Sequence, residues 1–227
     1  MEPLQVKSAN AQVKASREAT CRKVLEYFQL QLSQLSLLCF IDEEDVEDMD
    51  FEREKNARLG ITNRGFFVFN VEWTLNTGTP PLPFYVEERL RGTAGEILFK
   101  KLIYIHGSAC EPEVSLVISL SHELQHYFQH MNYPQSHIAD MSLQGSLKSW
   151  QEYPSEHDAM LKSKQVTSIL CDEDVVRRYT NSRIELAKKN QQDWHVDQLR
   201  WEFIRDLQIT DKYDFANEVA KLIDSHN

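Results

Sequence analysis

The stretch from Glu113 to His130 constrains the fold of this chain most, because it contains neither glycine nor proline. Its apolar residues recur at helical spacing, at Val114, Val117 and Ile118. Pro112 stands just before it, where a helix tolerates proline well. The sequence therefore predicts one continuous helix, and inside it lies the motif His122-Glu123-Leu124-Gln125-His126.

This HExxH motif suits a metal ion, since residues four apart on a helix lie on the same face. Two histidines can bind one Zn²⁺ through ring nitrogens at about 2.0–2.1 Å. Glu123 follows the first histidine, and a zinc hydrolase needs a carboxylate there as the base for a water whose pKa the metal lowers to about 7. The alternative is a surface helix on which His122, Glu123 and His126 are ordinary polar residues.

A catalytic zinc site usually has three protein ligands and one open position, so a third ligand is required. His130 continues the i, i+4 series, but its helix position lies about 12 Å from His122, which is too far for one ion to bridge. The metzincin pattern needs glycine and histidine where this chain has Gln129 and Asn132, so that class is excluded.

Glu156 is the preferred third ligand. Pro154 and Ser155 are typical of a helix start, and apolar spacing predicts a helix from there to about Cys171 with Glu156 in its first turn. The alternative is that Glu156 and Asp158 only complement the positive end of the helix dipole. Glu152 is the next candidate for the ligand.

The stretch Glu156-His157-Asp158-Ala159, some tens of residues after HExxH, resembles the gluzincin type of zincin metallopeptidase. It is similar to the Glu-x-Glu-Ala signature of the ImmA/IrrE-like peptidases, with Asp158 in place of the second glutamate. The resemblance implies that zinc is bound by His122, His126 and Glu156, and that Glu123 is the general base. It also implies an α+β fold in which a small mixed sheet packs on the HExxH helix, with an edge strand that pairs with an extended substrate.

Composition is that of an ordinary globular protein, with 41% hydrophobic and 26% charged residues in 227. One domain is the default at this length. No apolar run approaches a membrane span, the N-terminus lacks the apolar core of a secretory signal, and the four cysteines form no C-x-x-C pair. We expect a cytoplasmic protein with free thiols.

A formal charge of −10 argues against nucleic acid as a partner, because phosphates require a basic surface. Much of this charge comes from the acidic run between Asp42 and Glu54. The run has no central glycine and does not match an EF-hand loop, so we interpret it as a solvated turn or helix end.

The chain divides coarsely into an N-terminal helical and acidic segment (1–56), a zincin-like core (57–171) and a helical C-terminal part (172–227). Apolar spacing predicts a helix over 12–40. Residues 57–110 are predicted to be rich in strands, at Gly65–Val71, Ile97–Phe99 and Leu102–His106, with a loop over 76–83.

The sequence thus predicts a zinc metallopeptidase that hydrolyses peptide bonds in a protein substrate. Two alternatives stay open: a binding or regulatory protein with this fold but no activity, and a metal-free helical interaction protein. The oxyanion-stabilising residue is unassigned; the candidates are His106, Tyr127, Tyr153 and His157. The oligomeric state is likewise left open.

Overall fold

A computed structural model describes residues 2–30, 36–42, 65–78, 82–106, 110, 112–142, 153–189, 194–206 and 213–226. The chain forms two compact units, Met1–Leu120 and Ser121–Asn227. Together they hold helices and one small mixed sheet, so the predicted α+β class is confirmed. The organisation as a single domain with a zincin-like core over 57–171 stays a prediction.

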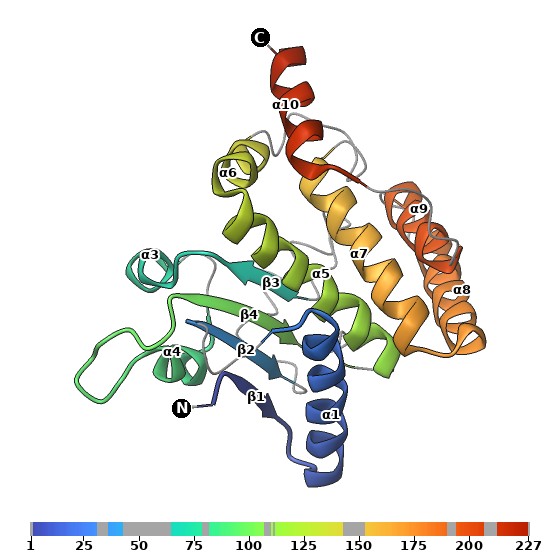
Figure 1. The fold of residues 1–227 in the computed structure, drawn as a ribbon. Helices are drawn as coiled ribbons and strands as arrows, with labels where there is room; N and C mark the ends of the chain where they lie inside the picture. The colour runs from blue at the N-terminus through green and yellow to red at the C-terminus, as the bar shows by residue number, and fades with distance from the viewer. Residues whose placement is uncertain are drawn as a thin grey trace. The chain divides into compact units, whose positions relative to one another are not determined.

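The first unit is built on a four-stranded sheet: β1 (Leu4–Lys7), β2 (Leu37–Asp42), β3 (Gly65–Val68) and β4 (Lys101–His106). The strand order is β1-β2-β4-β3; β2 is parallel to both of its neighbours and β3 runs antiparallel to β4 (Figure 1). Every residue of β2 is buried, and its apolar run Leu37–Ile41 is as expected of a central parallel strand.

Three helices accompany this sheet: α1 (Ala11–Tyr27), α3 (Val71–Thr77) and α4 (Phe84–Leu90). Asn10 caps α1 by accepting from the backbone N–H groups of Gln12 and Val13, and Asn70 caps α3 in the same way through Trp73. Gly78 ends α3 in the left-handed conformation (φ 68°). Apolar side chains of β2, β3, β4, α3 and α4 share one core cluster: Leu38, Phe40, Val68, Val71, Val86, Leu90, Leu102 and Tyr104.

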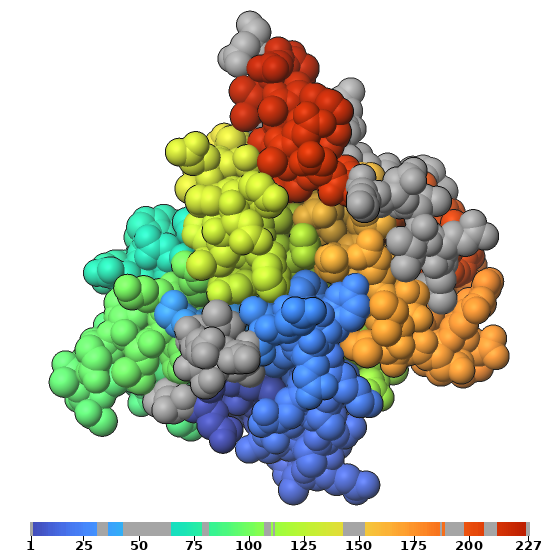
Figure 2. Space-filling model, in the orientation of Figure 1, coloured from blue at the N-terminus to red at the C-terminus, as the bar shows by residue number. Residues whose placement is uncertain are grey.

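The chain passes into the second unit within α5 (Glu113–Asn132), which carries HExxH. The other helices of this unit are α6 (Pro134–Ser142), α7 (Pro154–Leu170), α8 (Glu173–Lys189), α9 (Trp194–Arg205) and α10 (Phe215–His226). Trp201 of α9 packs edge-on against Tyr179 of α8, with ring centroids 5.6 Å apart. Figure 2 shows α10, in red, lying against the yellow-green α6. The ring centroids of Phe215 in α10 and of Tyr133 lie 6.1 Å apart.

The helices predicted over 113–130 and from Pro154 to about Cys171 are confirmed as α5 and α7, and the C-terminal part is helical where it is described. The helix predicted over 12–40 is wrong at its end, because residues 37–40 belong to β2. The region 57–110 is also not uniformly strand-forming. β4 lies at the predicted place, whereas β3 covers only Gly65–Val68 of the strand predicted to Val71, which begins α3. α3 and α4 lie between β3 and β4, and Ile97 makes only an isolated bridge with Arg91.

Residues 43–54 of the acidic run lie outside the described part of the chain. Among the helices that are described, none is both long and apolar enough to cross a membrane.

Candidate metal centre

The two histidines of HExxH lie one turn apart on α5 with their rings turned toward each other. Their centroids are 4.7 Å apart at an interplanar angle of 84°, and their Nε2 atoms are 3.1 Å apart. Both side chains are 11% exposed. The uninterrupted helix fixes this spacing, since His122 and His126 occupy neighbouring positions on one face.

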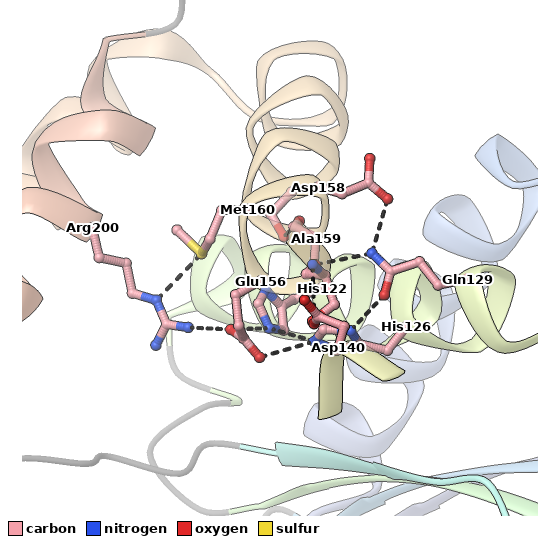
Figure 3. A network of polar contacts seen from close by, with 11 residues as sticks. His122, His126, Gln129, Asp140, Glu156, Asp158, Ala159, Met160 and Arg200 are labelled. Carbon is pink, nitrogen blue, oxygen red and sulfur yellow. Dashed lines mark hydrogen bonds and ion pairs between the residues drawn. The ribbon is translucent and has the colours of Figure 1, made fainter. Parts of the chain in front are cut away.

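Glu156 reaches this pair from the first turn of α7, which begins at Pro154 (Figure 3). Its Oε2 lies 3.3 Å from Nε2 of His122, and its Oε1 lies 3.3 Å from Nε2 of His126. Within the part of the chain that is described, these three residues form the one group of three or more potential ligands whose atoms lie within 4.8 Å of one another.

The spacing of these atoms fits a small tetrahedral ion. Bonds of about 2.0–2.2 Å at tetrahedral angles separate two ligand atoms by about 3.3–3.6 Å. The two Nε2 atoms are 3.1 Å apart, and each lies 3.3 Å from a different oxygen of Glu156, Oε2 for His122 and Oε1 for His126, which is close to this range. Two imidazoles and one carboxylate are also a ligand set found in catalytic zinc sites.

Gln129 determines which ring nitrogen of His126 carries the proton and which has a free lone pair. The amide nitrogen of Gln129 donates to the carbonyl oxygen of Ser155 at 2.9 Å and to Oδ2 of Asp158 at 2.8 Å. Both partners can only accept, so the amide oxygen must face Nδ1 of His126, at 2.9 Å. That oxygen accepts a hydrogen bond, so Nδ1 carries the proton. In the neutral ring, the lone pair then lies on Nε2, the atom that faces His122 and Glu156.

Asp140 of α6 holds the beginning of α7 in place. The N-cap residue Tyr153 makes no side-chain capping bond. Instead, Oδ2 of the buried Asp140 accepts hydrogen bonds from both the backbone N–H (3.3 Å) and the hydroxyl of Ser155. An amide of the first helical turn is thereby satisfied from a neighbouring helix. Because Glu156 is the next residue, this contact also positions the third candidate ligand.

Burial and charge together shift the pKa values of the central groups. Burial alone would lower the pKa of His126, but its hydrogen bond with Glu156 and the charges of Glu156 and Glu123 raise it to about 9. Burial alone would raise the pKa of Glu156, yet the two histidines hold it well below its usual range. Without a metal, His126 and Glu156 therefore form an ion pair, and a cation bound here would displace the proton of His126.

Glu123 lies one residue after His122, about 100° round the helix, and is 8% exposed. Burial raises the pKa of its carboxyl above the usual range, against the opposing charges of His122 and His126. A raised pKa improves a carboxylate as a proton acceptor near neutral pH, as a general base requires.

The structure thus brings the predicted residues His122, His126 and Glu156 together, with Glu123 beside them. Glu152, the other candidate ligand, lies outside the described residues. Among the candidates for oxyanion stabilisation, His157 stacks on Tyr213 at 4.7 Å in the second unit, and His106 stacks on Tyr104 at 5.7 Å in the first. Neither of these contacts places His157 or His106 at the three ligand residues, and the oxyanion-stabilising residue stays unassigned.

Three residues with contacts to the site were not predicted: Gln129, Asp140 and Arg200. The helical spacing of Gln129, three positions after His126, is a signal that could have indicated contact. No comparable local signal exists for Arg200, which donates from Nη2 to Oε2 of Glu156 at 3.3 Å across 44 residues of sequence.

No protein-family model matches this chain, and neither a curated protein nor a solved structure matches it significantly.

Proposed function

We propose that this protein is a zinc-dependent metallopeptidase of the zincin type. His122, His126 and Glu156 would hold the ion. When bound, zinc supplies Lewis-acid chemistry: it polarises a peptide carbonyl and lowers the pKa of water to about 7. Glu123 accepts the proton of the attacking water and then passes it to the amine that leaves.

What supports the proposal most is the position of Glu156. The motif alone supplies two ligands and a base, whereas a catalytic site needs a third protein ligand. Glu156 comes from another helix and lies 3.3 Å from the Nε2 atoms of both histidines. Its side chain is 25% exposed, so the ligand cluster is accessible to solvent. The orientation of His126 by Gln129 is a second, independent support.

The first experiment is zinc content by mass spectrometry on the purified full chain, beside His126→Ala and Glu156→Ala. We expect about one zinc per wild-type chain and loss of zinc in both variants. His130→Ala is the matched control: it removes an imidazole one turn further along α5, outside the ligand group, and should keep the metal. A wild type without zinc, even after reconstitution, would refute the proposal.

The catalytic part of the proposal is tested with Glu123→Gln. This variant should retain zinc, because Glu123 is not among the ligands, but lose the hydrolysis of a mixture of internally quenched peptides. The expected loss is at least about a hundredfold, the contribution of a general base. Equal hydrolysis by the variant and the wild type would contradict the mechanism. Zinc binding without hydrolysis by the wild type would favour a binding or regulatory protein instead.

A further inference from the structure

Arg200 of α9 makes two contacts with α7 beside the candidate ligands. Its Nη2 donates to Oε2 of Glu156 at 3.3 Å, and its Nε donates to Sδ of Met160 at 3.3 Å. Figure 3 shows the guanidinium spanning these two side chains, which stand one turn apart on α7. The Arg200 side chain is 28% exposed, and Met160 is buried at 1%.

The planarity of the guanidinium makes this pair of contacts directional. Its N–H groups point outward in fixed directions within one plane, so the contact of Nε with the buried sulfur constrains where Nη2 points. That direction leads to Glu156. A lysine ammonium, which rotates freely at the end of a flexible stem, could not be fixed in the same way.

The contact of Arg200 with Glu156 also bears on the orientation of the carboxylate. The terminal torsion of a glutamate is broad, so its carboxylate needs a partner to hold one orientation. Arg200 donates to Oε2, which also lies 3.3 Å from Nε2 of His122, while Oε1 lies 3.3 Å from Nε2 of His126. On the proposed zinc site, we infer that Arg200 is a positioning residue, which holds the carboxylate of Glu156 in the orientation that faces the two histidines.

The positive charge of Arg200 and its positioning role change the zinc affinity in opposite directions. A fixed cation beside a Zn²⁺ site repels the metal, so a purely electrostatic Arg200 would weaken zinc binding. A positioning Arg200 strengthens it, as residues that orient metal ligands do. The sign of the change on substitution therefore distinguishes the two roles. A third possibility is an Arg200 that binds an anionic group of the substrate, which would change KM and leave zinc affinity unaltered.

The test measures the zinc dissociation constant of the full chain by competition with a chelator. We expect Arg200→Met to weaken zinc binding by about tenfold or more, and Arg200→Lys not to restore it. Met160→Leu keeps the apolar volume and the charge of Arg200 but removes the sulfur anchor, so it should produce a smaller loss of the same sign. Arg205→Met is the matched control on the same helix, since Arg205 contacts Asn181 at 3.1 Å instead.

Substitution of cobalt(II) for zinc gives a second readout, because its visible absorption is stronger with four bound atoms than with five. In Arg200→Met, the carboxylate of Glu156 is no longer held in one orientation, and the absorption should change relative to the wild type. Tighter or unchanged zinc binding in Arg200→Met, or rescue by Arg200→Lys, would overturn the inference while leaving the zinc site intact. Retention of zinc by Glu156→Ala would instead show that the proposed ligand set is wrong.

Discussion

At the scale of single residues, the amide of Gln129 decides which nitrogen of His126 is available. It is 2% exposed, and its two donor contacts with Ser155 and Asp158 leave only its oxygen for His126. The HExxH motif therefore supplies the imidazole, and a residue outside the motif supplies its tautomer. Replacing such a ligand partner typically weakens metal binding by about 10–100-fold.

We predict a loss of this size for Gln129→Leu, which keeps the volume of the side chain but not its hydrogen bonds. The measurement is the zinc dissociation constant. Gln125→Leu is the matched control, because the amide of Gln125 donates to the same Oδ2 of Asp158, at 2.6 Å, rather than to a histidine ring. Equal losses in the two variants would mean that Asp158, and not the tautomer of His126, is what matters.

The sequence predicts the proximity of His122 and His126 because helical periodicity is a local rule. It predicts Glu156 beside them only through ligand chemistry and the family resemblance, because Glu156 lies on another helix. Their role as zinc ligands stays a prediction. Arg200 could not be predicted, since its contact with Glu156 depends on how α9 lies against α7. A separation of 44 residues carries no periodic signal.

At the scale of secondary-structure elements, the position of Glu156 depends on how α7 begins. Asp140 satisfies the amide and hydroxyl of Ser155 from α6, in place of a capping side chain on α7 itself. We predict that Asp140→Ala lowers the free energy of unfolding by about 1 kcal/mol, the usual cost of a lost helix cap. It should also weaken zinc binding several-fold, because the first turn of α7 carries Glu156.

Asp172→Ala provides the control for this prediction. Asp172 caps α8 by accepting from the backbone N–H groups of Asp174 and Val175, at 2.9 and 3.2 Å. Its removal should cost a similar free energy in urea denaturation but leave the zinc dissociation constant unchanged. Weakened zinc binding in both variants would show that loss of stability alone explains the effect of Asp140.

The buried Asp42 at the end of β2 ties together a strand, a helix and a neighbouring strand of the first unit. Its Oδ2 accepts hydrogen bonds from the hydroxyls of Tyr85 and Tyr104, and Nζ of Lys7 lies 3.8 Å from Oδ1. Burial, together with the hydrogen bond and charge of Asp42, raises the pKa of Tyr85 from 10 to about 12. The folded protein thus keeps this phenol proton at a pH where the unfolded chain loses it.

The sign of the pH effect follows from this difference. Below pH 10 the contribution of Tyr85 to stability is fully present, and it is lost as the pH rises from 10 through 12. We predict that the melting temperature falls across this interval, and that the fall is smaller in Tyr85→Phe. Tyr133→Phe, at a side chain that is 49% exposed, should melt like the wild type. An unchanged fall in Tyr85→Phe would contradict the assignment.

The misprediction of β2 has a physical cause at this same scale. The residues of β2 before Asp42 form a short apolar run, Leu37–Ile41, that is buried on both faces, and such a run has no alternation by which to recognise a strand. The predicted helix over 12–40 was therefore extended into this run. α5 and α7 were predictable because each combines long apolar periodicity with a proline at its start.

At the scale of the whole molecule, the division into two compact units bears on how a metal would act on stability. All the candidate ligands, and the residues that orient them, belong to the second unit, Ser121–Asn227. The length and composition of the chain do not reveal this division, because it falls within α5, where the sequence has no linker.

Zinc should stabilise the second unit selectively. A ligand present at about a hundred times its dissociation constant stabilises the form that binds it by about 2.7 kcal/mol, which slows exchange through unfolding about a hundredfold. We predict that zinc slows hydrogen exchange in peptides of α7 and α9 by up to this factor, and in peptides of β2 and β4 by much less, as measured by mass spectrometry. Glu156→Ala under the same zinc concentration is the control and should show no slowing. Equal slowing in both units of the wild type would contradict the prediction, because it would mean that the chain unfolds as one cooperative body.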